Sequence, residues 1–147
     1  MTAVGYRVLA GSFLLLAVQA AGAQARLYDR LGGQVGVAAI ADTLIDRVAA
    51  DPMLGQSFKD SKLARIKTLL AEQICELSGG PCRYSGDSMQ EVHAGHHISQ
   101  AEFYGMVADL RLVLKERQVS QGAVNELLRL LAPMKRDVVE PARVAAQ

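Results

Sequence analysis

The stretch YSGDSMQEVHAGHHISQAEF, residues 84–103, contains all three histidines of the chain and two signals for the start of a helix. Each signal is a serine followed three positions later by a glutamate: Ser88 with Glu91, and Ser99 with Glu102. In such a capping box the serine side chain accepts from the glutamate N–H, and the carboxylate reaches back to the serine N–H. We therefore expect a short helix from the first serine, ended by Gly95 after about two turns, and a longer helix from the second.

The histidine cluster is where any chemistry of this chain would be centred, because the sequence has no other imidazole. The G-x-S-x-G, G-x-G-x-x-G and H-E-x-x-H motifs are absent from it. His93 and His97 would form a two-point zinc or copper site if they shared one helix face, although Gly95 between them opposes this. His93 alone would hold a haem iron from one side. A third interpretation is that the histidines are exposed at a helix end, where the dipole favours positive charge.

The rest of the chain has apolar residues spaced three and four apart, as in helices that are buried on one side. Further helices are expected over 27–31, from Gly33 to the Asp51-Pro52 pair, over about 61–77, and from about 120 to 138 with a bend at Pro133. Residues 51–58 should form a loop or a single turn, and residues 77–86 a connector rich in turn residues. The expected fold class is therefore all-α.

The N-terminal residues 1–23 have the pattern of a secretory signal peptide. Arg7 precedes a short apolar run, and a small-residue stretch ends at Ala23. Cleavage there, or after Ala25, would leave one domain over residues 24–147 in the periplasm or outside the cell. An uncleaved anchor is an alternative, but a membrane span needs about 20 apolar residues, more than this run supplies. An ordinary buried helix is the remaining alternative.

Composition narrows the function classes. Half of the residues are hydrophobic and 21% are charged, which suits a packed globular core. The formal net charge is only +1, so the chain lacks the basic excess that nucleic-acid binding requires. The same balance argues against a polybasic contact with an anionic membrane.

Cys75 and Cys82 are seven residues apart in the segment CELSGGPC. In an oxidising compartment such a pair favours a disulfide. Gly79 and Gly80 can supply the chain reversal that brings the sulfurs together. Free thiols and a metal-binding role are the alternatives.

Four segments of the chain resemble the truncated haemoglobins, chiefly their first group. They are the opening LYDRLGGQVGVAAIADTLIDRVAADPML, the Phe58 region, the GGP turn at residues 79–81, and the 84–103 stretch. In that family a Tyr-Thr/Ser-Gly segment precedes a Met, the iron-binding His, a Gly, an Ile and a Phe. Here these are Tyr84, Ser85, Gly86, Met89, His93, Gly95, Ile98 and Phe103. The resemblance covers about residues 27–139 and implies a two-over-two helical sandwich.

The resemblance also implies one haem b per chain, with His93 as the proximal iron ligand. Phe58 and Phe103 match aromatic residues against the haem, Tyr84 lies where the connector approaches its edge, and Val107 lies on the helix that follows. Arg65 or Lys67 would pair with a haem propionate. The sequence has no Cys-x-x-Cys-His motif, so the haem is expected to be held without a covalent bond.

The chain departs from the family on the distal side. First-group members place a Tyr and a polar residue, often Gln, where this chain has Ile45 and Leu70, with Leu44 and Ile66 beside them. Gln73, one turn further, lies either at the rim of the pocket or close enough to donate to the gas ligand. An apolar distal pocket predicts a protein that binds oxygen, carbon monoxide and nitric oxide but retains oxygen weakly.

Three function classes follow from these features. A gas carrier, scavenger or sensor is favoured over an enzyme that oxidises nitric oxide, because distal donors are missing and export removes cytoplasmic reductants. The third class is a haem-free periplasmic metal-binding protein. The expected partners are diatomic gases and, if the iron is redox-cycled, an electron-transfer protein; nucleic acid and a lasting membrane anchor are not expected.

Overall fold

The computed structural model describes residues 25–140. The expected signal peptide therefore lies outside the described residues. The elements, with η for 3-10 helices, are α1 (Leu27–Arg30), α2 (Gly33–Ala50), η1 (Leu54–Phe58), α3 (Leu63–Leu77), α4 (Met89–His93), α5 (Gln100–Glu116), α6 (Gln121–Leu131), η2 (Ala132–Met134) and α7 (Lys135–Val138). Within residues 25–140, no helix is both long and apolar enough to cross a membrane.

Both predicted capping boxes are present. The hydroxyls of Ser88 and Ser99 accept from the N–H groups of Glu91 and Glu102, each at 3.2 Å. The two carboxylates accept in return from the serine N–H groups, at 3.0 and 2.8 Å. α4 is shorter than expected, with five residues, and Gly95 beyond it has a φ of +79°. A left-handed residue of this kind ends a helix.

Pro52 follows a helix end, as the sequence predicts, and Pro133 breaks the last helix, where the sequence predicts a bend. Asp51, in extended conformation before Pro52, ends α2. Its Oδ1 accepts from the N–H groups of Met53 and Leu54, both at 2.8 Å, and so caps η1. Near the C-terminus, Pro133 lies within the short 3-10 turn η2 that separates α6 from α7. A proline has no N–H to donate and cannot continue the α-helical ladder.

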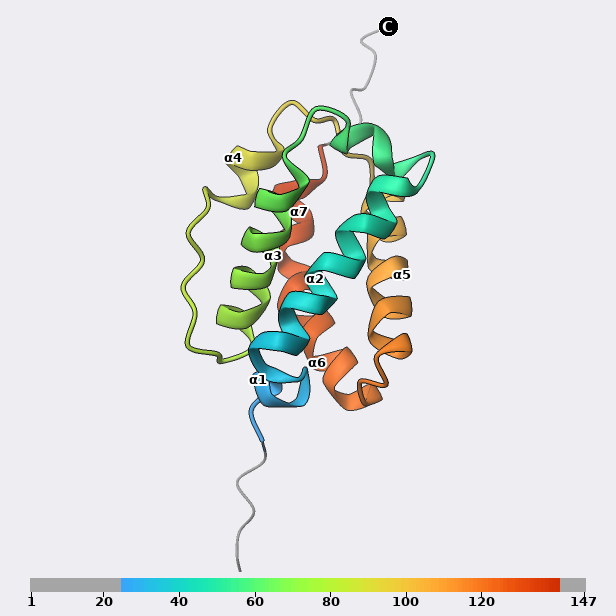
Figure 1. Cartoon of the computed structure of the whole chain (residues 1–147). Coiled ribbons are helices and arrows are strands. Elements are labelled where there is room, and N and C mark those ends of the chain that lie inside the picture. Colours follow the sequence, from blue (N-terminus) through green and yellow to red (C-terminus); the bar gives the residue numbers. More distant parts are fainter. Residues whose placement is uncertain (1–24, 141–147) are drawn as a thin grey trace, which may run out of the picture.

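The helices form two antiparallel pairs, α2 with α3 and α5 with the α6–α7 segment (Figure 1). This is the two-over-two sandwich that the sequence predicts. The core between them is filled by side chains that are at most 1% exposed: Ile40, Leu44, Val48, Ile74, Val113, Leu114 and Leu127. Each apolar side chain buried in this way contributes about 1.5–3 kcal/mol. Apolar packing between the two pairs therefore supplies most of the stability.

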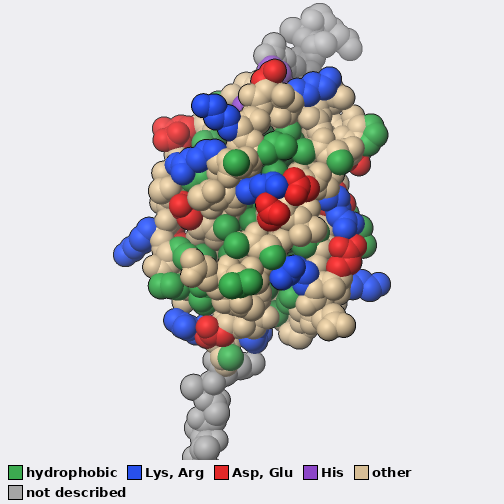
Figure 2. Space-filling view, viewed as in Figure 1, with side chains coloured by type: hydrophobic (Ala, Val, Ile, Leu, Met, Phe, Trp, Pro, Cys, Tyr) green, Lys and Arg blue, Asp and Glu red, His purple; other side chains and the backbone are tan. Residues whose placement is uncertain are grey.

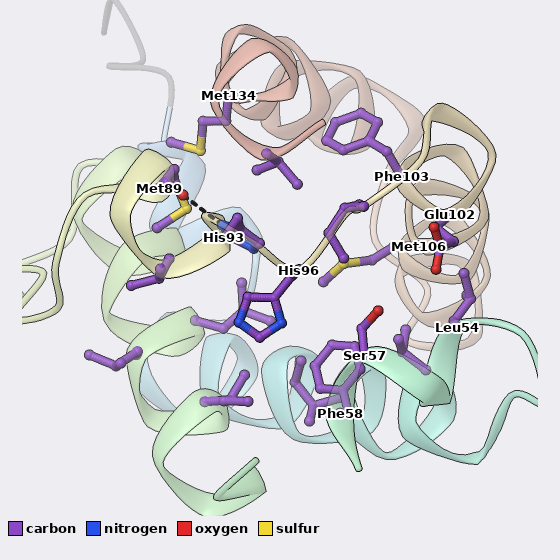
Figure 3. Close-up of a pocket in the computed structure, with 18 of the residues that line it drawn as sticks. Leu54, Ser57, Phe58, Met89, His93, His96, Glu102, Phe103, Met106 and Met134 are labelled. Atoms are coloured by element: carbon purple, nitrogen blue, oxygen red, sulfur yellow. Dashed lines mark hydrogen bonds between the residues drawn. The ribbon is translucent and has the colours of Figure 1, made fainter. Parts of the chain in front are cut away.

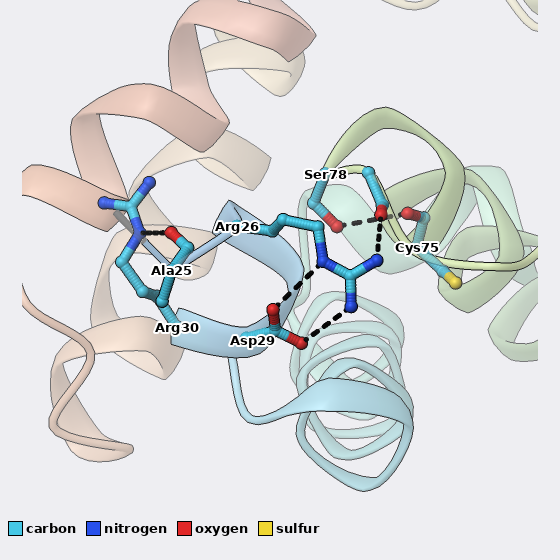
Figure 4. A network of polar contacts seen from close by, with 7 residues as sticks. Ala25, Arg26, Asp29, Arg30, Cys75 and Ser78 are labelled. Carbon is cyan, nitrogen blue, oxygen red and sulfur yellow. Dashed lines mark hydrogen bonds and ion pairs between the residues drawn. The ribbon is translucent and has the colours of Figure 1, made fainter. Parts of the chain in front are cut away.

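Polar contacts tie the first described residues to the end of α3. The Arg26 guanidinium donates to the Asp29 carboxylate and to the carbonyl oxygen of Gly79. The Ser78 hydroxyl, which is buried, donates to the carbonyl oxygens of Ile74 and Cys75. Figure 4 shows the bond to Cys75 and the contacts of Arg26. These hydrogen bonds fix the turn at the end of α3, where the connector to α4 begins.

Ion pairs join neighbouring helices on the surface. Arg47 on α2 makes two contacts with Glu116 on α5, at 2.7 and 2.8 Å, and Arg30 pairs with Glu126. On the face shown in Figure 2, basic and acidic side chains are interspersed and neither sign dominates. Exposed pairs of this kind are worth at most about 1 kcal/mol each. They orient the helices more than they stabilise them.

Candidate functional site

A cavity of about 360 Å³ lies between the α2–α3 pair and the wall formed by α4, α5, η2 and α7 (Figure 3). This volume falls within the range of about 300–1,000 Å³ that is typical of small-molecule sites. Its walls are mostly aliphatic, aromatic and thioether side chains. The predicted site residues that line it are Ile45, Phe58, Ile66, Leu70, Tyr84, His93, Phe103 and Val107. Phe58 and Phe103 face the cavity from opposite sides.

His93 is the last residue of α4 and presents its imidazole to this cavity. Its Nδ1 lies 2.8 Å from the carbonyl oxygen of Met89, one turn earlier (Figure 3). A carbonyl oxygen only accepts, so Nδ1 carries the proton and donates it. In the neutral ring Nε2 then bears the free lone pair. Fixing one nitrogen in this way is how proteins prepare the other as a metal ligand.

α4 contributes no buried residue to the core, so its position depends on the connector that precedes it. Two carboxylates of α3 hold that connector. Glu72 accepts from the N–H and hydroxyl of Ser85, at 3.0 and 2.7 Å, and Glu76 accepts from the N–H of Tyr84 at 3.1 Å. The Ser85 hydroxyl, and then its N–H, lower the pKa of the Glu72 carboxyl. Burial raises the pKa of the neighbouring Tyr84 phenol.

The predicted disulfide is present and secures the same connector. Cys75 and Cys82 are bonded, with their Cα atoms 5.7 Å apart. Gly79 supplies a φ of +82° in the reversal. A Cβ at Gly80 would lie 2.6 Å from the Cys75 sulfur and 2.6 Å from the Tyr28 ring, so only glycine fits there.

The wall opposite His93 is apolar. Ile45 of α2 is 1% exposed, and Ile66 and Leu70 of α3 also line the cavity. Gln73 of α3 lines it too, but its Nε2 donates to the sulfur of Met89 at 3.3 Å. The amide therefore bridges the two walls in this structure.

Three predicted site residues do not line the cavity. Leu44 is 1% exposed and packs in the core between the helix pairs. Arg65 is exposed on α3. Lys67 binds Asp42 and Asp46 of α2, at 2.8 and 2.7 Å, and these carboxylates raise the pKa of its ammonium. Adjacent positions on a helix point to different sides, so a residue next to a lining residue faces away from the cavity.

His96 is a lining residue that the sequence analysis did not assign, and it carries a second imidazole. It lies in the loop after α4, is exposed, and directs its ring to the cavity mouth (Figure 3). His97 lies outside the cavity lining, and its Nδ1 is 2.7 Å from the Glu140 carboxylate. The two-point metal site suggested for His93 and His97 is therefore not formed. In residues 25–140 no group of three or more His, Cys, Asp or Glu side chains gathers around one point.

The remaining lining residues that were not predicted are Val48, Leu54, Ser57, Ser61, Leu69, Met89, Val92, Ile98, Glu102, Met106, Leu110, Leu131, Met134 and Val138. Many follow the apolar periodicity of their helices, which does not separate a cavity wall from a core face. The chemistry of the site is thus one prepared imidazole in an apolar slot. Such a donor set fits a metal that brings its own equatorial ligands, as haem iron does, since a bare ion requires several protein ligands.

Comparisons with a family description and with individual known proteins identify the same family. Residues 26–140 match the family described as bacterial-like globin. The group 1 truncated hemoglobin GlbN of Mycolicibacterium paratuberculosis is 30% identical over 114 residues, which cover 78% of this chain and 84% of that protein. The group 1 truncated hemoglobin of Tetrahymena pyriformis is 26% identical over 113 residues, which cover 77% of this chain and 93% of that protein.

Solved structures agree with the sequence relatives. The Fe(III) form of the T. pyriformis protein superposes with a TM-score of 0.75 at 25% identity, covering 80% of this chain and all of that one (100%). The 2/2 hemoglobin of Synechococcus sp. PCC 7002, in the cyanomet state with covalently attached heme, gives a TM-score of 0.72 at 26% identity and covers 78% of this chain and 98% of its own. The chain therefore belongs to the bacterial-like globins and, within them, to the group 1 truncated haemoglobins, which are haem globins.

Proposed function

We propose that this protein is an exported truncated haemoglobin that holds one haem b non-covalently through His93 and binds diatomic gases in an apolar distal pocket. The observation that carries the proposal is the His93 imidazole. Its Nδ1 is engaged by the Met89 carbonyl at 2.8 Å, and its ring lines an apolar cavity between the two helix pairs.

Each wall of the cavity has a distinct part in this proposal. His93 binds the iron from the α4 side, and the Met89 carbonyl keeps the ring from rotating and makes it a better donor. Phe58 and Phe103 pack against the porphyrin and exclude water. Ferrous haem, when bound, would supply the iron that takes up oxygen, carbon monoxide or nitric oxide.

The opposite wall sets the preference among gases. Oxygen gains partial negative charge on ferrous haem and is retained by hydrogen-bond donors, whereas carbon monoxide and nitric oxide depend on them less. Ile45, Ile66 and Leu70 offer no donor, and the Gln73 amide donates to the Met89 sulfur. We therefore expect fast oxygen dissociation, ready oxidation of the iron, and comparatively strong binding of carbon monoxide and nitric oxide.

A non-covalent haem is supported by the state of the cysteines. The chain has two, and they are bonded to each other.

Export is supported by the N-terminal sequence pattern and by the same bridge, because disulfides persist in oxidising compartments. Fractionation of native cells, with mass spectrometry of the mature N-terminus, tests it. A protein that begins at residue 1 and remains in the cytoplasm would contradict export.

Titration of the purified apoprotein with hemin tests the haem site. We expect an intense Soret band that saturates at one hemin per chain and that acid–butanone extraction removes. Because His96 also reaches the cavity, His96→Gln is the matched control for His93→Gly. Loss of the band in the His93 variant alone supports the assignment. A colourless protein that retains zinc would support a haem-free metal-binding function instead.

A further inference from the structure

The loop of residues 94–98 connects the His93 helix to α5 and has an unusual backbone. Gly95 has a φ of +79° and His97 a φ of +53°. The second value is rare for a residue with a side chain and persists only where the surroundings impose it. The loop also carries His96 and Ile98, both of which line the cavity. The conformation of this loop therefore determines the shape of the cavity wall that follows His93 in the chain.

Glu140 lies beyond the end of α7, and within residues 25–140 its side chain makes all of its hydrogen bonds with this loop. Its Oε1 accepts from the N–H of Gly95 at 2.7 Å and from that of His97 at 3.2 Å. Its Oε2 lies 2.7 Å from Nδ1 of the His97 ring. The Glu140 N–H donates to the carbonyl oxygen of Ile98 at 3.1 Å. Four contacts thus join Glu140 to three residues of the loop, Gly95, His97 and Ile98.

The contacts between Glu140 and the 94–98 loop differ from an ordinary surface ion pair. The Glu140 side chain is 32% exposed and the His97 side chain 64% exposed, so charge attraction alone would be weak. The carboxylate, however, also receives two backbone N–H groups that have no helical partner. Hydrogen bonds to a carboxylate are about twice as strong as neutral ones. The His97 ring, and after it the N–H groups of His97 and Gly95, lower the pKa of the Glu140 carboxyl. The segment that carries Glu140 itself borders the cavity through Met134 and Val138.

We propose that Glu140 is a positioning residue for the haem site: by holding the 94–98 loop against the end of α7, it fixes the orientation of the His93 imidazole. This inference rests on the proposed function, in which His93 binds haem iron. Glu140 does not touch the cavity and acts only through the loop. A loosened loop would let the end of α4 shift, since α4 has no buried residue to anchor it.

The test compares Glu140→Ala and Glu140→Gln with Asp137→Asn, all in the full mature chain loaded with hemin. Glutamine keeps an oxygen for the two backbone N–H groups but loses the charge that pairs with His97. Asp137 is the matched control because it is a carboxylate on α7 whose ion pair is with the adjacent Arg136. Two readouts are needed: hemin transfer to a haem-scavenging protein, and the iron–histidine stretching band of the ferrous protein by resonance Raman.

We expect Glu140→Ala to raise the hemin dissociation rate about tenfold, the lower end for a lost bond to a charged group. The iron–histidine band should shift or broaden, Glu140→Gln should be intermediate, and Asp137→Asn should match wild type. A band and rate unchanged in both Glu140 variants, with the protein still loaded through His93, would overturn the inference alone. Hemin binding that survives His93→Gly without change would instead overturn the proposed function, and the inference with it. If Glu140→Ala fails to fold, Glu140→Gln decides by the same two readouts.

Discussion

Introducing a donor at Leu70 tests the apolar distal wall. Leu70 is half-buried on α3 and lines the cavity opposite His93. The family resemblance implies that it occupies the position where first-group members carry a polar residue. Glutamine has a similar length and volume, so Leu70→Gln should place an amide over the bound gas without overpacking the site.

The expected change in the oxygen dissociation rate follows from the side chains around Leu70. Apart from Gln73, whose amide donates to the sulfur of Met89, the lining side chains of α2 and α3 are aliphatic and offer no donor. A hydrogen bond to a group that bears charge contributes about 1.5–3 kcal/mol. If the amide donates to bound oxygen, the oxygen dissociation rate should fall about 10- to 150-fold. Carbon monoxide dissociation should change much less.

Flash photolysis and stopped-flow displacement of oxygen by carbon monoxide measure both rates. Leu70→Met controls for changed packing, and Leu77→Gln places the same amide on α3 away from the cavity lining. Both controls should keep the wild-type rates. Two results would refute the reasoning: slow oxygen dissociation already in the wild-type protein, or no slowing in Leu70→Gln. The first would mean that another donor already reaches the gas, and the second that the side chain at position 70 does not face it.

Three further outcomes are expected. Met89→Leu removes the sulfur that holds the Gln73 amide, so oxygen dissociation should slow about 2- to 10-fold, and adding Gln73→Leu should reverse this in the same stopped-flow assay. Reduction of the Cys75–Cys82 bridge should lower the free energy of unfolding by about 2–3 kcal/mol; urea titrations with and without dithiothreitol measure it, and coincident curves would contradict it. Lys67→Met should leave hemin dissociation unchanged, because Asp42 and Asp46 bind that ammonium; faster loss would restore Lys67 as a propionate partner.

Local sequence signals predicted the helices well, for reasons visible in the structure. The capping boxes at Ser88 and Ser99 depend on residues three positions apart, so short-range pattern is sufficient to locate them. The ends at Asp51 and around Pro133 depend on the covalent geometry of proline, which no tertiary contact can override. The disulfide likewise spans a short loop with its own turn residues.

The site was predicted only as far as family resemblance and helical phase allow. His93 and the apolar residues that line the cavity with it follow from both. Leu44 and Lys67 lie next to lining residues on their helices but do not line the cavity themselves, because one position along a helix turns a side chain by roughly 100°. Glu140 carried no signal, since it meets Gly95 across 45 positions of sequence. A contact of that kind is created by the packing of α7 and cannot be read from spacing.

Chemical rescue of His93→Gly is the most direct measurement of the iron ligand. Apoprotein of this variant is loaded with hemin, and spectra are recorded with and without free imidazole, alongside His96→Gln. We predict that the glycine variant loses the wild-type Soret and iron–histidine bands and regains them when imidazole enters the space left by the ring. A glycine variant with wild-type bands in the absence of imidazole would contradict the assignment of His93 as the residue that holds the haem.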